Sequence, residues 1–276
     1  MQKLASPAVD SVRLPFKTRR MRLESIESNG SAFVTCWFSG DDLRDLQSPG
    51  AGDHIKLQVP DASGHLVVPA FDEAGERLAN RADLALRDMT PRIVDAAAGR
   101  LRIDFVRHQG GVIGPWLERA AVGDELAFVG PRGSRRIVEA VDEVRFVADL
   151  TALPSAERRF DELPDTVTGE LHLVVDTAAD IDAISVPERI RIITHELGTD
   201  GVAGGWPGVA TALEASLASI KPTQRILIWA AGEASGVASI RAVANAIARE
   251  GVFGAFNGYW RAGEAEYDHH APLPEL

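Results

Sequence analysis

The chain has 276 residues, a formal net charge of −11 and a single cysteine. The acidic excess argues against a nucleic-acid partner, because neutralising phosphates requires clustered Lys and Arg. One cysteine rules out an internal disulfide, and no stretch approaches the roughly 18 apolar residues that a membrane span requires. We therefore expect a soluble, cytoplasmic protein with no stable membrane association, divided into two domains.

The N-terminal half consists of short strand-like runs separated by turn residues. Asn29-Gly30 lies between two of these runs, which is a hairpin signal. The runs cover residues 21–26, 32–38, 54–59, 85–93, 101–106 and 125–129. Several short strands with turns between them favour a small closed β-barrel, which we place in residues 1–138.

The C-terminal half, residues 139–276, alternates strand-like and helix-like segments. The predicted strands cover residues 144–148, 169–175, 190–194 and 226–229, and the predicted helices cover residues 153–163, 209–220 and 237–250. This alternation predicts a parallel sheet with helical crossovers. Ligands of such sheets bind at the carboxyl ends of the strands, which here are residues 149–151, 176–177, 195–196 and 232–233.

A glycine-rich stretch at residues 107–116 joins a predicted strand to a short predicted helix. The strand ends at Gly110-Gly111, and Pro115 is expected at the first helical position. Free backbone N–H groups at such a helix start bind anions such as phosphate. The alternative is an ordinary glycine-rich turn that binds nothing.

Two further segments carry candidate cofactor ligands. Arg87 suits a pyrophosphate through its paired donors, and Thr90 is expected at a strand end because Pro91 follows it. The alternative places these groups on a solvated strand edge. Asp149 and Thr151 follow a predicted strand, where they either contact a dinucleotide or cap the next helix.

The chain lacks the motifs of a self-contained catalytic centre. It has neither a Gly-x-Ser-x-Gly elbow nor a Gly-Lys-Ser/Thr phosphate loop. His195-Glu196 and His269-His270 lack further ligands at metal-binding spacing, so we expect no metal site. A cofactor is therefore expected to carry the chemistry, with Trp116 or Trp260 covering its ring unless they pack in the core.

Taken in order, several segments resemble one family. The chain resembles the siderophore-interacting proteins, which are flavin-dependent ferric-siderophore reductases of the ferredoxin-reductase-like superfamily. The segments that carry the resemblance are residues 53–57, 87–92, 108–116, 123–124, 130–133, 149–154, 229–235 and 258–263. Each is weak alone, but together they span nearly the whole chain.

The resemblance implies a six-stranded antiparallel FAD-binding β-barrel followed by a Rossmann-like α/β domain that binds NAD(P)H. It implies electron transfer from NAD(P)H through FAD to an Fe(III)-siderophore, with release of Fe(II) for intracellular use. A ferredoxin-type donor also fits the family, and a monomer is expected. The alternatives are a general NAD(P)H-flavin diaphorase or ferric reductase, and a non-catalytic protein that binds iron chelates.

The resemblance also assigns residue roles. Arg87 would approach the flavin phosphates and Thr90 the isoalloxazine ring. The remaining cofactor candidates are His108, Gly110, Gly111, Gly114, Pro115 and Trp116 in the first domain, and Asp149, Thr151, Ala152, Gly232, Glu233 and Trp260 in the second. Local charge suggests Lys56, Arg92 and Arg261 as a basic rim for an anionic iron complex.

This sequence departs from the family pattern at two cofactor positions. Met89 stands where the family has a tyrosine, so a flexible thioether replaces an aromatic ring beside the flavin. Leu150 stands where the family has a glutamate. Both changes leave the backbone amides and Arg87 in place, so FAD binding is expected to survive. The reduction potential and the choice between NADH and NADPH remain open.

Overall fold

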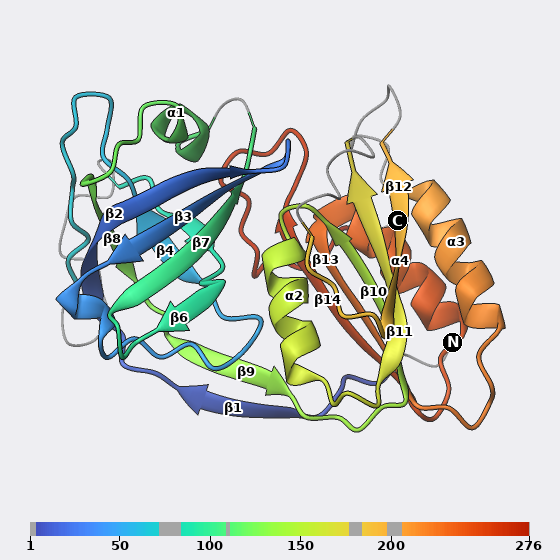
Figure 1. Cartoon of the computed structure of the whole chain (residues 1–276). Helices are drawn as coiled ribbons and strands as arrows, with labels where there is room; N and C mark the ends of the chain where they lie inside the picture. The colour runs from blue at the N-terminus through green and yellow to red at the C-terminus, as the bar shows by residue number, and fades with distance from the viewer. Residues whose placement is uncertain (1–3, 72–83, 109–110, 177–183, 198–205, 276) are drawn as a thin grey trace. The chain divides into compact units, whose positions relative to one another are not determined.

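The computed structural model describes residues 4–71, 84–108, 111–176, 184–197 and 206–275, which form two compact units (Figure 1). The N-terminal unit is Asp10–Arg136, and the C-terminal unit combines Ile137–Leu276 with Met1–Val9. The first residues belong with the C-terminal unit because the N–H of Gly254 donates to the carbonyl of Ala5 over 2.8 Å. Strands β1 (Val9–Arg13) and β9 (Gly133–Ile137) pair where the chain passes between the units.

The N-terminal unit is built on one antiparallel sheet. Its strands run in the order β5-β4-β8-β2-β3-β7-β6. Their bounds are β2 Thr18–Asn29, β3 Phe33–Ser39, β4 Ile55–Gln58, β5 Arg87–Met89, β6 Ile93–Asp95, β7 Arg100–Val106 and β8 Glu125–Val129. The predicted hairpin is confirmed, since β2 and β3 pair around Gly30, which has a φ of 64°.

Seven strands form this sheet within the described residues, against the expected six. The predicted segment 85–93 is two short strands, β5 and β6, at opposite ends of the strand order. Pro91 lies between them and has no N–H to donate to a ladder, so it interrupts the pairing. The chain therefore changes neighbours at this point, pairing first with β4 and then with β7.

Alternating side chains form the core of this unit. In β7, Leu101, Ile103 and Phe105 are buried, while the intervening residues are half-buried. This period of two is the pattern of a strand with one apolar face. Each fully buried side chain of this size contributes about 1.5–3 kcal/mol relative to exposure. A 3-10 turn at Asp41–Leu43 and the short helix α1 (Ile113–Leu117) complete the unit.

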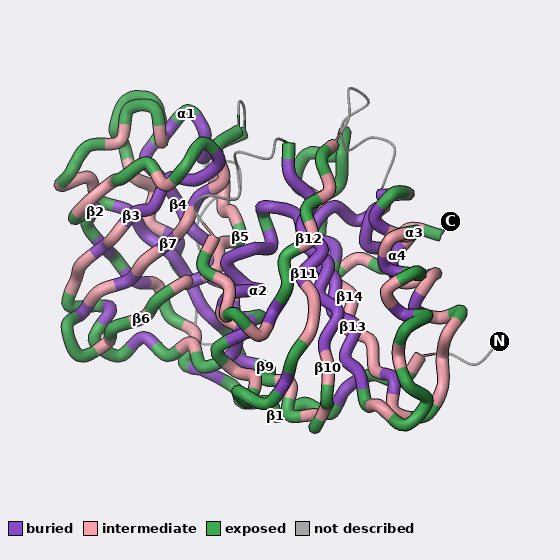
Figure 2. Tube along the Cα trace, turned by 45° about the vertical axis from the view of Figure 1, so that its right-hand side comes forward, coloured by how far each residue is buried: buried purple, intermediate pink, exposed green. Residues whose placement is uncertain are grey.

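The C-terminal unit contains the predicted parallel sheet. The strand order is β12-β11-β10-β13-β14, and every pairing is parallel. The bounds are β10 Glu143–Asp149, α2 Leu153–Glu162, β11 Thr168–Val175, β12 Ile190–Glu196, α3 Pro207–Ala218, β13 Ile226–Glu233, α4 Ala234–Ala246 and β14 Val252–Trp260. Strand β13, which lies between β10 and β14, is buried along its whole length, as expected for a sheet covered on both faces (Figure 2).

Helices cover the two faces of this sheet. Phe146 of β10 stacks on Phe160 of α2, with ring centroids 5.2 Å apart. The next residue, Val147, points to the opposite face, where it packs in a cluster with Leu213 of α3 and Ile240 of α4. The arrangement places α2 on one face and the pair α3 and α4 on the other.

Two predicted boundaries at the end of the sheet were wrong. The strand expected over 226–229 continues to Glu233, and the helix expected over 237–250 is Ala234–Ala246. The helix starts early because the Glu233 side chain caps it, accepting from the N–H of Gly236 over 2.7 Å. Strand β14 was not expected. No helix in the described part of the chain is long and apolar enough to cross a bilayer.

Gly236 of α4 lies against the buried indole of Trp206. A Cβ on Gly236 would stand 2.3 Å from Cδ2 of that ring. Gly236→Ala should therefore lower the free energy of unfolding of this unit by about 1–3 kcal/mol through overpacking. The measurement is the urea midpoint. Gly208→Ala in α3 is the control, because no atom lies within 4 Å of its added Cβ. Equal midpoints for the two variants would contradict the prediction.

Candidate functional site

Asp149 ends strand β10 and is the most highly bonded side chain at the carboxyl edge of the C-terminal sheet. Its Oδ1 accepts from the backbone N–H and the hydroxyl of Thr151, over 2.9 and 2.6 Å. Its Oδ2 accepts from the N–H of Glu233 over 2.8 Å and from Nε1 of Trp260 over 2.9 Å. These four donors occupy both oxygens. Burial raises the pKa of Asp149, while the hydrogen bonds act in the opposite direction.

The Asp149 carboxylate limits which residue can occupy position 232 in the neighbouring strand β13. Gly232 has a φ of 138°, and a Cβ there would lie 2.4 Å from Oδ2 of Asp149. Only glycine fits both conditions. The β13–β14 register shifts between Gly232 and Glu233, which sets Trp260 opposite Glu233. The three strand ends at β10, β13 and β14 are thereby tied together.

Glu233 is a second buried carboxylate at this edge, with 1% of its surface exposed. Its Oε2 caps α4 through Gly236, and its Oε1 accepts from the N–H of Ala262 over 3.3 Å. Glu233 therefore holds the start of α4 and the segment after β14. Its contact with a nicotinamide remains a prediction.

The helix-capping alternative for Asp149 and Thr151 is wrong. The N-cap of α2 is Ala152, and no side chain caps this helix. Asp149 instead binds Thr151, which is exposed, while Ala152 is buried. Leu150, the residue that stands where the family has a glutamate, is also buried.

In the N-terminal unit, strand β5 presents the candidate flavin ligands. Arg87 pairs with Leu57 and Met89 with Ile55, so both side chains lie on one face of the strand. Met89 packs against the core of the unit. The half-buried Arg87 donates from Nη1 to the carbonyl of Leu86 over 3.0 Å. Thr90 follows directly and is half-buried.

The glycine-rich stretch ends in a helix of five residues, Ile113–Leu117. Pro115 is its third residue, so the expectation of Pro115 at the first position was wrong. Proline is tolerated there because the first-turn N–H groups have no intrahelical acceptor. Gly111 has a φ of 65°, and a Cβ on Gly114 would lie 2.5 Å from the His108 carbonyl oxygen. Gly110 lies outside the described residues.

Trp116 has 1% of its surface exposed and packs edge-on against Phe105, with ring centroids 5.7 Å apart. Its side chain is part of the core, which is the alternative expected for this residue, and its contact with a cofactor remains a prediction.

The two candidate flavin segments are linked through the end of β4. Arg119, just after α1, donates to the carbonyls of Pro115 over 2.7 Å and Pro60 over 2.8 Å. Pro60 lies three residues beyond Leu57, the partner of Arg87. At about 3.3 Å per residue this is roughly 10 Å of extended chain. The structure thus brings the glycine-rich stretch toward the strand that pairs with Arg87.

The candidate substrate cations have acidic or backbone partners. Nζ of Lys56 lies 2.8 Å from Oδ1 of Asp88, and Nη1 of Arg261 lies 3.5 Å from Oε2 of Glu264. The N–H of Arg92 donates to the carbonyl of Arg102 over 2.9 Å. Partly exposed ion pairs contribute about 0–1 kcal/mol, so an anionic ligand can compete for these cations.

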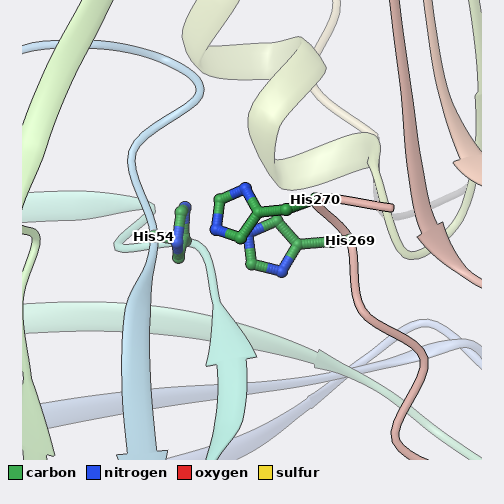
Figure 3. Close-up of side chains that lie close together, drawn as sticks. All are labelled: His54, His269 and His270. Atoms are coloured by element: carbon green, nitrogen blue, oxygen red, sulfur yellow. The ribbon is translucent and has the colours of Figure 1, made fainter. Parts of the chain in front are cut away.

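Figure 3 shows three histidines that come from different segments. His269 and His270 are adjacent in the C-terminal unit, with ring centroids 3.9 Å apart. His54 belongs to the N-terminal unit, where its Nε2 lies 4.0 Å from Oδ1 of Asp88. His54 and Lys56 therefore share one carboxylate partner, Asp88 of β5.

Sequence reasoning missed a buried polar network in the C-terminal unit. Nδ1 of His172 lies 3.0 Å from Nε2 of His195, and Nε2 of His172 lies 3.3 Å from Oε2 of Glu170. Glu170 also accepts from the hydroxyl of Ser216 over 2.5 Å, and Nε of Arg145 lies 3.5 Å from Oε2 of Glu170. The network connects β10, β11, β12 and α3. The only feature of the sequence that could have indicated this network is an acidic residue two positions before a histidine on one strand.

The network has strongly shifted pKa values. Burial and the neighbouring His195 lower the pKa of His172 to about 4. Burial also lowers the pKa of His195. Burial alone would raise the pKa of Glu170, but hydrogen bonds from Ser216 and Arg191 and the charge of Arg145 lower it to about 2. At neutral pH both histidines are therefore neutral, and Glu170 is ionised.

The two units define a class of protein. A sheet domain that matches a FAD-binding family model precedes a parallel α/β domain, and this arrangement has the fold of ferredoxin reductases of known structure. The sequence model of the siderophore-interacting FAD-binding domain matches residues 22–135, and that of the siderophore-interacting protein matches residues 141–263. The chain belongs to the siderophore-interacting protein family.

Relatives of known structure or name support this membership. A siderophore utilization protein from T. fusca is 32% identical, with a TM-score of 0.80 over 96% of this chain and 100% of that one. The ferric vibriobactin reductase ViuB of Vibrio cholerae is 29% identical over 84% of this chain and 85% of its own length. The NADPH-dependent ferric-chelate reductase of Escherichia coli is 32% identical over 55% of this chain, and the match spans only 59% of that relative.

Asp149→Asn tests the bonded carboxylate. An asparagine keeps one acceptor oxygen but turns an NH2 group toward two of the four donors. We expect the free energy of unfolding of the C-terminal unit to fall by about 1–3 kcal/mol, as measured by urea denaturation. The control is Asp165→Asn, because the Asp165 side chain is fully exposed. A midpoint equal to that of the control would show that the four hydrogen bonds contribute nothing.

His172 should make the C-terminal unit sensitive to acid. Its pKa is about 4 in the folded state, against an ordinary value of 6.5, so the unfolded chain takes up the proton first. Stability is therefore full above pH 6.5 and is lost as the pH falls toward 4. We expect about 2 kcal/mol to be lost between pH 7 and pH 5.

Amide hydrogen exchange in β10 and β11 at the two pH values measures the free energy of opening of these strands. His172→Gln should reduce this loss, because the glutamine side chain takes up no proton. An equal loss in wild type and variant would exclude His172 as its source.

Proposed function

We propose that this protein is a ferric-siderophore reductase that passes electrons from NAD(P)H through FAD to an Fe(III)-siderophore. One observation carries the proposal: an FAD-binding domain and a siderophore-interacting domain follow each other in a single chain, at residues 22–135 and 141–263. The relatives named as ferric vibriobactin reductase and ferric-chelate reductase support the same reaction.

The residues of the N-terminal unit fit FAD. Arg87 supplies a guanidinium beside the sheet, and the tight loop at Gly111 and Gly114 brings backbone close to His108 without side chains in between. FAD held there would supply two-electron acceptance of a hydride and one-electron donation to Fe(III). Arg87 would hold the diphosphate, and Thr90 would donate to the ring. Met89 would contact the flavin in place of an aromatic side chain.

The edge of the C-terminal sheet receives the nicotinamide donor in this proposal. Thr151 is exposed at that edge and oriented by Asp149, while Gly232 and Glu233 shape the adjoining turn. Trp260 is held by the same carboxylate through its Nε1, so its indole has a defined orientation. None of these residues needs to act as an acid or base, because electron transfer to iron moves no proton from the protein.

The substrate enters as an anionic or neutral Fe(III) complex. Lys56 and Arg92 on the N-terminal unit and Arg261 on the C-terminal unit are the cations proposed to contact it. Reduction to Fe(II) lowers the metal's charge, so the hard oxygen ligands of a siderophore hold it less firmly. We place the reaction in the cytoplasm and expect a monomer. A ferredoxin is the alternative electron donor.

The decisive experiment is anaerobic. Purified protein is loaded with FAD, NADH or NADPH is added, and the flavin band is followed. Ferric hydroxamate and catecholate siderophores are then added with a ferrous chelator that develops colour. Bleaching followed by colour supports the proposal. Bleaching followed by iron reduction at equal rates with ferric siderophores and with simple ferric chelates would indicate a general diaphorase. Chelate binding without bleaching by either nucleotide or by reduced ferredoxin would indicate a non-catalytic binding protein.

Arg87→Ala should weaken FAD binding by about 1.5–3 kcal/mol, the contribution of hydrogen bonds from a charged donor. The dissociation constant is measured by titrating the apoprotein and following flavin fluorescence. Arg22→Ala is the control, because Arg22 is exposed and paired with Glu125 over 2.6 Å. Unchanged FAD affinity in Arg87→Ala would remove this residue from the site.

A further inference from the structure

Positive charge is concentrated in two short segments of this acidic chain. Residues 10–20 and 131–138 hold seven of the 29 Lys and Arg residues but only one of the 40 Asp and Glu residues. The segments come together because strands β1 and β9 lie side by side as a two-stranded ribbon (Figures 1 and 2). On a chain with a net charge of −11, this local excess of cations distinguishes the β1–β9 ribbon from the acidic remainder.

The two strands of the ribbon run antiparallel. Backbone hydrogen bonds join them at both ends, from the Leu14 N–H to the Arg132 carbonyl over 3.1 Å and from the Val138 N–H to the Ala8 carbonyl over 2.9 Å. This register sets Gly133 opposite Arg13, and a Cβ on Gly133 would stand 4.0 Å from Cα of Arg13. Two residues further along β9, Arg135 lies opposite Ser11.

Arg13 and Arg135, which both belong to the N-terminal unit, project from the same face of the ribbon. Cross-strand partners share a face, as do residues two apart on one strand. The other face carries Leu14 and Ser134, which are 6% and 3% exposed. The cross-strand neighbours of the two arginines are a glycine and a serine, and both arginines are exposed. The two guanidinium groups therefore point away from the interior of the unit.

These two cations differ from other exposed arginines of the same unit. Arg22 and Arg44 are each paired with a carboxylate, over 2.6 and 3.3 Å. In the described part of the chain, neither Arg13 nor Arg135 has an ion-pair partner. Both are therefore available to an external anion, and a guanidinium binds phosphate oxygens through paired N–H donors.

Strand β1 also exposes apolar surface. Its Val9 and Val12 are 38% and 51% exposed, and they are two of the six exposed large apolar side chains among the described residues. Cations beside exposed apolar side chains suit a lipid surface, where the cations reach the phosphates and the apolar groups enter the interface. The backbone of a nucleic acid would use the cations and leave the valines in water.

We propose that the β1–β9 ribbon docks this protein reversibly on an anionic lipid surface, with Arg13 and Arg135 bound to lipid phosphates. The same surface repels the acidic remainder of the chain, so the ribbon is the part that faces it. Salt weakens the association, because the attraction falls off within a Debye length. The proposal concerns where the protein is held and does not depend on the electron-transfer reaction.

The test uses the purified full chain and vesicles of phosphatidylcholine, alone or mixed with phosphatidylglycerol, sedimented at about 50 and about 500 mM salt. We expect binding to the mixed vesicles only, and weaker binding at the higher salt. Arg13→Gln combined with Arg135→Gln should lower the partition coefficient about 25-fold, since each cation near such a surface contributes about fivefold. Arg13→Lys combined with Arg135→Lys should retain most of the binding, because it keeps both charges.

The matched control is Arg22→Gln combined with Arg44→Gln, which removes the same net charge from other positions of the N-terminal unit and should leave the coefficient nearly unchanged. Equal losses in the two double variants would overturn the proposal, because net charge alone would explain them. Absence of binding to the mixed vesicles would overturn it too, including the case in which RNA or polyglutamate binds through Arg13 and Arg135 instead. Bleaching of the flavin by NAD(P)H in solution should be equal in all variants, which separates a failure of docking from a failure of the proposed reductase.

Discussion

The carboxylate of Asp149 is the interaction on which the C-terminal sheet edge depends. Burying a carboxylate costs several kcal/mol unless hydrogen bonds replace its water, and here four donors do so. Those donors come from the turn after β10, from β13 and from β14. The same oxygen that binds Trp260 prevents any side chain at position 232. Because one group contacts all three strand ends, it holds in one arrangement the edge at which we propose that the nicotinamide donor binds.

The layout of the C-terminal unit could be predicted because its strands are short apolar runs between helical periods. Every predicted strand there exists, and the expected parallel sheet is confirmed. The ends were harder to predict, since they depend on contacts across the sheet. Glu233 caps α4 although glutamate is an uncommon N-cap, so no residue at this position indicated that a helix begins there. Strand β14 contains three small or flexible positions, Gly254, Ala255 and Gly258, which weakened its strand pattern.

In the N-terminal unit, turn residues predicted the hairpin, but nothing local in the sequence predicted which strands become neighbours. Asn29-Gly30 indicated the hairpin of β2 and β3, whereas the switch at Pro91 from one neighbouring strand to another depends on the whole sheet. The family resemblance, based on ordered motifs, predicted the cofactor class that periodicity alone left open. The His172 network could not be found in this way. Its members come from three strands and a helix, and only the register across β10, β11 and β12 brings them together.

Departures from ordinary local rules gather at one place in this chain. A glycine at a φ of 138°, a register shift, a glutamate N-cap and two buried carboxylates all occur at the carboxyl edge of one sheet. Each costs stability that a regular strand-to-helix turn would not, and proteins retain such costs mainly at functional positions. Parallel sheets bind ligands at this edge because the strand ends and helix starts converge there. These departures therefore support the proposal that the nicotinamide donor binds at this edge, and they do so independently of any motif.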